Sequence, residues 1–459
     1  MEKSIFIPMK AEDLTTLRIF YNWKTDEVFL SASKDWDDDL DWSRYNKDFY
    51  VESIKTHNAK YLNEQEVKAM FEKYNLTGYL EEIIALLREG RHFGIIAYLN
   101  QKLDIKYMGN IHNRKCGINN GKHATVGGGI RRHEKSDAEI DVIIDGLNLG
   151  RAMSFKNVAG ELPMGGIKST VIMDPLDLND FQQIGFLGFA LDSMRCETGP
   201  DMGFPIEMTD VMIENGYSHQ YTCGPHGPLG SSGPPTAYGV YIALEEAVKF
   251  LGHDNMDGWS FACQGLGQVG WSMVEEICTK VKNPHLIVAD TNQEAVDKCI
   301  KTWSEKGIDI KSCDVKDVLF QDVDVVVPCA IGGIFTEENI GDLKCKIIWG
   351  SANNQIKASG QEEEIRLAQK IADRGILFQT DWWHNTAGVM FAWEEVCFQE
   401  KADIEHVYKV ISDVLPRLTR ENLKDAKERG LTPTANAYRK VEGILYGDDP
   451  LPEYTAWLK

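Results

Sequence analysis

The sequence predicts an α/β protein with two domains, the second of which contains an open parallel sheet covered by helices. A chain of 459 residues exceeds the usual size of a single domain. In its second half, short apolar runs alternate with stretches of helical periodicity, which is typical of a parallel sheet. The glycine-rich segment FACQGLGQVG, residues 261–270, joins one such run to a helix, as expected of a strand–turn–helix unit in a parallel sheet.

The first half of the chain begins with a polar, aromatic-rich N-terminal extension, residues 1–90. Apolar residues at helical spacing predict helices over 63–74 and 77–89. The segments FGIIAYLN and LDIKYMGNIH, residues 93–100 and 103–112, are predicted strands. We expect these strands to open the first domain.

A long helix is predicted to follow from Ser136, because Glu139 stands three residues later in the pattern of a capping box. Residues 91–230 are assigned to the first domain on this basis. The chain becomes helical again near its end, and residues 386–459 are expected to pack back on that domain.

The second domain is assigned to residues 231–385. It follows a stretch rich in glycine, proline and serine, Gly224–Pro235, which predicts a loop at the domain boundary. A helix is predicted over 236–252, ending at a glycine. Further strands are predicted in the apolar runs 286–290, 322–330, 346–352 and 376–380.

The glycine-rich segment has the spacing of a dinucleotide-binding motif in its usual context, between a strand and a helix. Gly265 permits a tight turn, Gly267 lets the backbone approach a pyrophosphate, and Gly270 lets the helix pack close to the strand. The helix opens with Gln268 and Val269, whose N-terminal dipole favours phosphate. Twenty residues on, Asp290 is placed to accept hydrogen bonds from a ribose diol, and no Arg or Lys follows to bind a 2′-phosphate. The sequence therefore favours NAD over NADP.

Composition excludes several other classes of function. The formal net charge of −21 disfavours a nucleic acid or an anionic membrane as partner. Ten cysteines without a CxxC pair indicate reduced thiols in a cytoplasmic protein, and no metal site is expected. The N-terminus has no apolar stretch of signal-peptide length, and no apolar run approaches transmembrane length.

Candidate chemistry lies in MSFKNVAGELPMGGIKST, residues 153–170, which holds Lys156 and Lys168. Two ammonium groups in one partly buried pocket lower each other's pKa, so that one could hold a carboxylate while the other acts as a base. Asp201 lies in the constrained loop GPDMGF, and Asn353 and Asn354 follow an apolar strand in GSANNQ. Taken separately, these patterns also fit surface lysines and ordinary polar turns.

The pieces together resemble the family of leucine, phenylalanine, valine and glutamate dehydrogenases, most closely its leucine and phenylalanine members. The resemblance extends over about residues 93–395, and its motifs occur in the family's order: MSFKN, GGIK, GPDMG, TAYGVY, GLGQVG, PCAIGG, GSANNQ and NTAGV. It implies an N-terminal α/β domain for substrate binding and oligomerisation, a Rossmann-like doubly wound domain that binds NAD, and a cleft between the two. The first ninety residues carry no match.

The resemblance also implies roles for single residues. Lys156 should hold the substrate α-carboxylate, Lys168 should activate the water that attacks the imine, and Asp201 should shuttle protons to and from the amine. Asn353 or Asn354 should contact the substrate. The remaining positions implied to face the cofactor are Thr236, Cys329, Ala330 and, at the cleft, Asn385.

The side chain of the substrate is expected to be large and apolar, either branched or aromatic. Gly127 stands where glutamate members of the family carry a lysine, and Ala392 stands where they carry a serine, so no partner for a distal carboxylate is evident. Both residues are smaller than the aliphatic residues of leucine members, and together with Val389 they predict a roomy apolar pocket.

The predicted reaction is reversible oxidative deamination of an L-amino acid to the 2-oxo acid and ammonia, with NAD as cofactor, by a homo-oligomer. Two alternatives stay open. The first is a dehydrogenase on the same scaffold for an unusual amino acid or amine, and the second is an NAD-binding regulatory protein without turnover. Retention of Lys156, Lys168 and Asp201 argues against the second.

Overall fold

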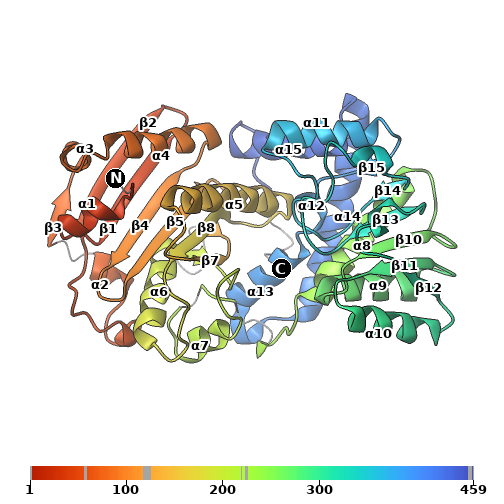
Figure 1. Ribbon diagram of the computed structural model, residues 1–459, viewed down its shortest axis with the longest axis horizontal. Coiled ribbons are helices and arrows are strands. Elements are labelled where there is room, and N and C mark those ends of the chain that lie inside the picture. The colour runs from red at the N-terminus through yellow and green to blue at the C-terminus, as the bar shows by residue number, and fades with distance from the viewer. Residues whose placement is uncertain are drawn as a thin grey trace. The chain divides into compact units, whose positions relative to one another are not determined.

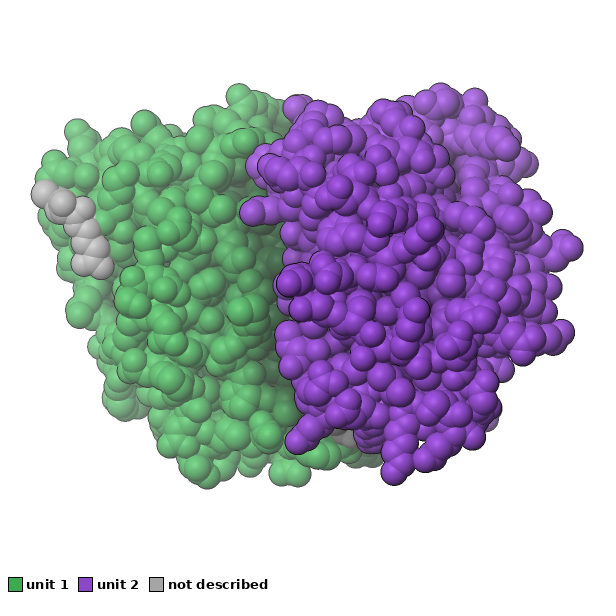
Figure 2. Space-filling model, turned by 45° about the vertical axis from the view of Figure 1, so that its right-hand side comes forward, with its two compact units in different colours: residues 1–158, 162–230, 392–402 green, residues 159–161, 231–391, 403–459 purple. Residues whose placement is uncertain are grey.

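The structure is a computed structural model, which describes residues 3–55, 59–116, 126–218, 220–222, 226–452 and 457. Its chain divides into two compact units, coloured separately in Figure 2. Unit 1 comprises residues 1–158, 162–230 and 392–402, and unit 2 comprises residues 159–161, 231–391 and 403–459. Each unit is built around its own sheet (Figure 1).

The sheet of unit 1 has the strand order β3-β2-β1-β4-β5-β8-β6-β9, with β7 also paired to β8. Its strands from β3 to β8 along this order pair antiparallel, whereas β6, β7 and β9 join by parallel pairing. The strands are β1 (Thr16–Asn22), β2 (Glu27–Lys34), β3 (Lys60–Leu62), β4 (Gly94–Asn100), β5 (Ile105–Asn113), β6 (Val126–Gly127), β7 (Ile130–His133), β8 (Gly165–Ile172) and β9 (Cys196–Glu197).

Two apolar cores lie in unit 1, one containing Trp36, Trp42 and Phe189 and the other containing Phe71, Leu80 and Val142. Helix α6 carries a long buried stretch, and α5 approaches β5 and β8 closely because glycines of α5 face the sheet (Figure 1). The helices are α1 (Phe6–Ala11), α2 (Val51–Lys55), α3 (Glu64–Lys73), α4 (Thr77–Gly90), α5 (Glu139–Ala159), α6 (Phe181–Met194) and α7 (Met208–Glu214).

The sheet of unit 2 is entirely parallel and has the order β12-β11-β10-β13-β14-β15. In chain order this is 3-2-1-4-5-6, the order of a doubly wound dinucleotide-binding fold. The predicted α/β fold class with a Rossmann-like sheet is thus confirmed. The strands are β10 (Ser260–Gln264), β11 (His285–Ala289), β12 (Asp309–Ser312), β13 (Val325–Pro328), β14 (Ile347–Ile348) and β15 (Leu377–Phe378).

Helices of unit 2 complete the fold, and α8 packs against both α9 and α14. Helix α8 begins at Gly233, within the predicted boundary loop, because prolines are well tolerated in the first turn of a helix. Gly224 and Pro225 of that loop lie outside the described residues. The helices are α8 (Gly233–Phe250), α9 (Gln268–Lys280), α10 (Gln293–Ser304), α11 (Gln361–Ala372), α12 (Asp381–His384), α14 (Ile404–Arg429) and α15 (Pro433–Leu445). Helix α13 (Ala387–Phe398) is shared, because its residues from 392 onward belong to unit 1.

The division of the chain differs from the predicted one in two places. Residues 1–90 are an integral part of unit 1, because β1 pairs with β4 and extends the same sheet. At the other end, residues 403–459 belong to unit 2 and only 392–402 join unit 1, since α14 packs on α8. No helix in the described ranges has the length and apolar character that a membrane span requires.

Candidate functional site

The glycine-rich segment of unit 2 forms the turn between β10 and α9. Gly265 has a φ of +92°, a conformation that favours glycine, and its N–H donates to the carbonyl of Ala289 over 2.8 Å. A Cβ on Gly270 would overlap the carbonyl oxygen of Gly265, so a side chain there would force α9 away from β10. Above Gly267 a Cβ would meet nothing within 4 Å, and no side chain caps α9. Backbone N–H groups at the start of α9, at Gln268 and Val269, are therefore open to an anionic ligand.

Asp290 follows directly after β11, and its carboxylate is fixed against the glycine turn. One oxygen accepts from the N–H of Leu266 at 2.6 Å and the other from the N–H of Asn292 at 2.7 Å. Cys329 and Ala330 follow β13, the strand next to β10, and the N–H of Cys329 donates to Gln264. These residues surround the point at which the strand order reverses, where doubly wound sheets bind nucleotides. Their arrangement fits a dinucleotide.

The other predicted cofactor-facing residues also belong to unit 2. Thr236 lies in the first turn of α8, where its hydroxyl donates to the carbonyl of Ser232. Asn385 is buried between α12 and α13, and its amide donates to the carbonyl of Ser351 at 3.1 Å and to Oδ1 of Asn353 at 2.9 Å. Asn354 is exposed and has a left-handed φ of +52°.

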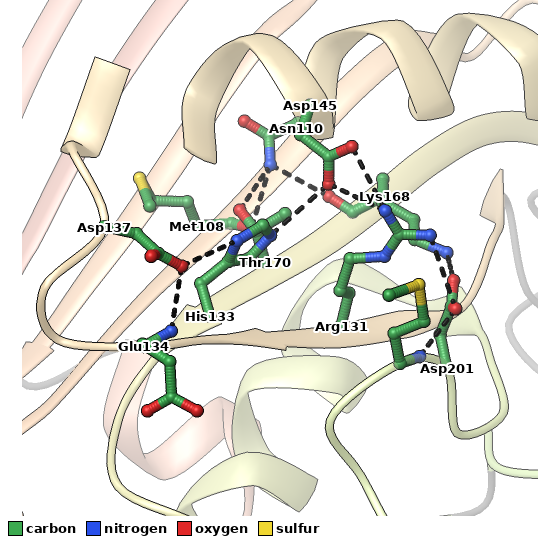
Figure 3. Close-up of polar contacts among 11 residues, drawn as sticks. Met108, Asn110, Arg131, His133, Glu134, Asp137, Asp145, Lys168, Thr170 and Asp201 are labelled. Atoms are coloured by element: carbon green, nitrogen blue, oxygen red, sulfur yellow. Dashed lines mark hydrogen bonds and ion pairs between the residues drawn. The ribbon is translucent and has the colours of Figure 1, made fainter. Parts of the chain in front are cut away.

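In unit 1, the structure brings Lys168 and Asp201 into direct contact (Figure 3). Lys168 points from β8, and its side chain is only 6% exposed, while Asp201 follows β9 and is 26% exposed. The ammonium of Lys168 donates to Oδ2 of Asp201, and the other carboxylate oxygen, Oδ1, accepts the N–H of Met202 at 2.6 Å. The two residues are 33 positions apart in the sequence, and the folding of the sheet brings their side chains together.

Burial and neighbouring charges shift the pKa values of both Lys168 and Asp201. Burial lowers the pKa of Lys168, the opposing effect of the Asp201 carboxylate is smaller, and the nearby cation that adds to the lowering is Arg131. Burial alone would raise the pKa of Asp201, but the charge of Lys168 and the hydrogen bonds that Asp201 accepts lower it overall. The pair therefore combines an ammonium that gives up its proton more readily than usual with a carboxylate that holds its charge.

Arg131 extends this pair into a network, visible in Figure 3. Its guanidinium lies 3.4 Å from Oδ1 of Asp201 and 3.1 Å from both oxygens of Asp145. His133 lies 3.3 Å from Asp145 on the other side. Asn110, which is fully buried, donates to the carbonyl of Lys168 at 3.0 Å and so fixes the strand that carries the lysine.

Lys156 lies on α5 and is half-buried. Its helix packs tightly on β8, because a Cβ on Gly166 would overlap the backbone N–H of Ser154. Of the residues predicted to line the side-chain pocket, Gly127 and Ala392 belong to unit 1 and Val389 belongs to unit 2. Helix α13 carries both Val389 and Ala392 across the division of the chain.

The sequence of this chain is similar to the sequences of known proteins. The model of the glutamate/leucine/phenylalanine/valine dehydrogenase family matches residues 230–442. A leucine dehydrogenase of Thermoactinomyces intermedius is 34% identical over 336 residues, which span 70% of this chain and 86% of the relative. A phenylalanine dehydrogenase of Lysinibacillus sphaericus is 30% identical over 277 residues, which span 59% of this chain and 69% of the relative.

This chain belongs to the glutamate/leucine/phenylalanine/valine dehydrogenase family. Its members are amino-acid dehydrogenases, so the chain is an oxidoreductase that acts on an amino acid, with NAD as the cofactor of the leucine, phenylalanine and valine enzymes. The solved structure of L-tryptophan dehydrogenase from Nostoc punctiforme has the same fold, with a TM-score of 0.66 and 24% identity over 79% of this chain and 98% of that one.

Within this dehydrogenase, neighbouring side chains occupy the space beside Gly127. The small residue there predicts a roomier apolar pocket. The space that a Cβ on Gly127 would enter is instead filled by the sulfur of Met164 and by Oε2 of Glu197, which lies 2.9 Å from that position. Two neighbours therefore occupy the space of the missing side chain, the apolar Met164 and the polar Glu197.

The sequence analysis did not identify Glu197 or Arg131 as part of this site. For Glu197 a signal was present, because Glu197, Gly199 and Asp201 alternate, and alternate residues of a strand face one side. For Arg131 no local signal exists, since its partners Asp145 and Asp201 lie on other elements.

Proposed function

We propose that this dehydrogenase catalyses the NAD-dependent, reversible oxidative deamination of an L-amino acid with a large apolar side chain, branched or aromatic, to the 2-oxo acid and ammonia. The observation that carries the proposal is the buried contact between Lys168 and Asp201. Family membership supplies the reaction class, and this contact supplies the acid and the base that such a reaction needs.

In the proposed reaction, the neutral form of Lys168 takes a proton from a water molecule, which then adds to the imine carbon of the substrate. The lowered pKa of Lys168 supports this role, because a base works best when its pKa approaches the working pH. Asp201 transfers protons to and from the substrate nitrogen, so that ammonia can leave. Its bond from the N–H of Met202 holds the carboxylate in one direction while it does so.

NAD, when bound, accepts a hydride from the substrate α-carbon. Gly265, Gly267, Gln268, Val269 and Gly270 would hold its pyrophosphate, and Asp290 its ribose hydroxyls. We assign the nicotinamide side of the site to Thr236, Cys329, Ala330 and Asn385, as a proposal that rests on the family motifs.

Substrate contacts are proposed for the remaining predicted residues. Lys156 holds the α-carboxylate, and Asn353 or Asn354 contacts the substrate. Gly127, Val389 and Ala392 line the side-chain pocket.

We further propose a homo-oligomer located in the cytoplasm. Cys196, Cys263, Cys299 and Cys345 are buried and form no disulfide, which supports a reducing compartment. Light scattering during size-exclusion chromatography measures the assembly, and a monomeric mass would contradict the proposal.

Incubation of the purified protein with NAD and each common L-amino acid at mildly alkaline pH tests the reaction, with NADH absorbance as the readout. Production of NADH and ammonia from leucine, phenylalanine or their relatives supports it. If no amino acid leads to NADH formation while NADH binding is still measurable, the result contradicts the proposal and favours an unusual substrate or a protein without turnover.

A further inference from the structure

Arg131 lies on β7, between β8 and the loop that carries Asp201, and the backbone fixes it there. Strand β7 pairs parallel with β8 on one side. On the other side, the carbonyl of Ile130 accepts the N–H of Asp201 at 2.9 Å, and the N–H of Arg132 donates to the carbonyl of Met202 at 3.0 Å. Hydrogen bonds of the backbone immediately before and after Arg131 therefore keep it beside Asp201.

Helix α5 supplies a second anchor for the guanidinium of Arg131, the carboxylate of Asp145 (Figure 3). The helix can approach the sheet because two of its glycines face Asn110. A Cβ on Gly146 would overlap the side-chain amide of Asn110, and a Cβ on Gly150 would lie 2.6 Å from its carbonyl oxygen. Gly146 directly follows Asp145, so this close approach brings Asp145 to the guanidinium, which lies 3.1 Å from both carboxylate oxygens.

The two oxygens of the Asp201 carboxylate have separate partners. Oδ2 accepts the ammonium of Lys168. Oδ1 accepts the N–H of Met202 at 2.6 Å and lies 3.4 Å from the guanidinium of Arg131. Because both partners of Oδ1 belong to elements that the backbone fixes, the carboxylate has one orientation, in which Oδ2 faces Lys168.

The charges around Lys168 alternate in sign from one element to the next. Burial lowers the pKa of Lys168 most, Asp201 after β9 raises it, Arg131 on β7 lowers it, and Asp145 on α5 raises it. Burial raises the pKa of Asp201, but the charge of Lys168, the accepted hydrogen bonds and finally the charge of Arg131 lower it overall. Arg131 thus favours a neutral lysine and a charged carboxylate, the two forms that the proposed reaction uses.

Two further titratable groups lie close to this network. His133, at the end of β7, lies 3.3 Å from Asp145 and 3.6 Å from Asp137. The thiol of Cys196, on β9, is buried, and burial raises its pKa to about 12, so that it stays neutral. Neither group distinguishes variants of Arg131 from variants of Asp145, since each is present in all of them.

We propose that Arg131 is a positioning residue for the reaction: it holds the carboxylate of Asp201 toward Lys168 and, anchored by Asp145, sets the charge of this acid–base pair. The inference rests on the proposed function and adds a residue to its machinery. Arg131 acts through Asp201 and Lys168, without contact with the substrate.

The pH profile of kcat separates this role from a purely structural one. Arg131→Met removes a cation and Asp145→Asn removes an anion, yet both variants break the same ion pair. Loss of the cation favours the charged form of Lys168, so its pKa rises and the increase of kcat with pH moves to higher pH. Loss of the anion has the opposite effect. A merely structural ion pair would move both profiles in the same direction or leave both in place.

The expected shift follows from the arrangement of the charges. Two cations on opposite oxygens of one carboxylate lie roughly 6 Å apart, which corresponds to about 0.5 pH unit in water and about 2 pH units at an effective dielectric constant of 20. Arg131→Met should therefore raise the midpoint of the profile by about 0.5–2 pH units. Asp145→Asn should lower it by less, because Asp145 lies beyond Arg131.

The size of kcat reports the orientation of Asp201. Arg131→Met should lower kcat by about 10–100-fold with NADH affinity unchanged, since misplacement of a reacting group is costly. Arg131→Lys, which keeps the charge but loses the fork of donors, should restore the midpoint and only part of kcat. Arg44→Met and Asp48→Asn are the matched controls, because these residues form an exposed ion pair at 2.6 Å, and neither should change the midpoint or kcat.

If Arg131→Met does not fold, Arg131→Lys and Asp145→Asn still decide the outcome. A midpoint that stays in place or rises in Asp145→Asn would overturn the proposal. So would a raised KM for the amino acid with kcat unchanged in Arg131→Lys, because that result would mean that Arg131 contacts the substrate.

A separate readout distinguishes this inference from the proposed function. Competitive acetylation with acetic anhydride, quantified by mass spectrometry on the peptide that contains Lys168, reports the titration of this amine without turnover. Opposite shifts of that titration in Arg131→Met and Asp145→Asn, but no NADH from any amino acid with NAD, would overturn the reaction and keep Arg131 as the residue that sets the charge of the pair. Turnover in the wild type, with midpoints that stay in place or move in the same direction in both variants, would overturn the role of Arg131 and keep the reaction.

Discussion

The buried carboxyl group of Glu197 should make the stability of the protein depend on pH in an unusual direction. Its pKa rises from 4.5 to about 8 because burial disfavours the charged form. Below pH 4.5 the group is protonated in both the folded and the unfolded chain and has no effect. Between pH 4.5 and 8 the unfolded chain releases the proton while the folded chain retains it, so stability falls as the pH rises.

The magnitude follows from the size of the shift. A rise from 4.5 to about 8 corresponds, at 1.36 kcal/mol for each pKa unit, to about 5 kcal/mol in the free energy of unfolding. Above pH 8 both states are ionised and the loss becomes constant. Replacement of Glu197 by Gln removes the titration while preserving the shape of the side chain. The variant should therefore gain up to about 5 kcal/mol relative to the wild type between pH 5 and pH 9.

Urea unfolding of both proteins at a series of pH values measures this difference. Glu214→Gln, at an exposed glutamate of α7, is the matched control for loss of one carboxyl group and should show a much smaller pH-dependent change. A difference between Glu197→Gln and the wild type that stays flat from pH 5 to pH 9 would refute the reasoning, since it would mean that Glu197 ionises as readily in the folded chain as in the unfolded one.

Three further predictions concern the acid–base pair and the glycine turn. Lys168→Met should lower kcat by about 10²–10⁴-fold with NADH affinity unchanged, whereas the exposed Lys135→Met should leave both values alone; a near-normal kcat would exclude Lys168 as the base. Asp201→Asn should destabilise the fold in urea by about 3 kcal/mol at pH 7, and more than Lys168→Met does, because it leaves a buried ammonium without its counter-charge; the reverse order would contradict the buried pair. Gly270→Ala should lower both the melting temperature and NADH affinity, while Gly267→Ala should weaken NADH binding alone, since a Cβ there meets no protein atom; equal melting losses would contradict this difference.

Local patterns in the sequence predicted the helices and the second sheet well. Helix α3 starts after Asn63, whose side chain forms a capping box with Glu66, and the helix was predicted from that same residue. The glycine turn was predictable for the same reason, because each glycine is required by a backbone contact within a few residues of itself. By contrast, β12 was missed: three of its four residues are exposed, so it carries no apolar run.

Long-range pairing explains what the sequence did not reveal. Strand β1 belongs to the sheet of unit 1 because Leu17 and Ile19 pair with β4, about eighty residues away, and no local pattern reports such a contact. Residues 403–459 join unit 2 rather than unit 1 for a similar reason, since α14 packs on α8, which lies far away in the sequence. Lys168 and Asp201 were assigned through family motifs, and only the sheet shows that their side chains meet.

Both units use glycine at the places where a ligand is proposed to approach the backbone. A ligand can approach a backbone closely only where side chains are absent, and glycines occur at both places where a ligand is proposed to bind. In unit 2 they follow β10, and the helix dipole of α9 supplies the attraction. In unit 1 they lie on the parallel strands beside β8 and β9, where the charged side chains of Lys168 and Asp201 supply it. Because the side chains of Lys168 and Asp201 are largely buried, their proposed interactions with a substrate are weakly screened by water, which gives both of them a strong influence on what the site accepts.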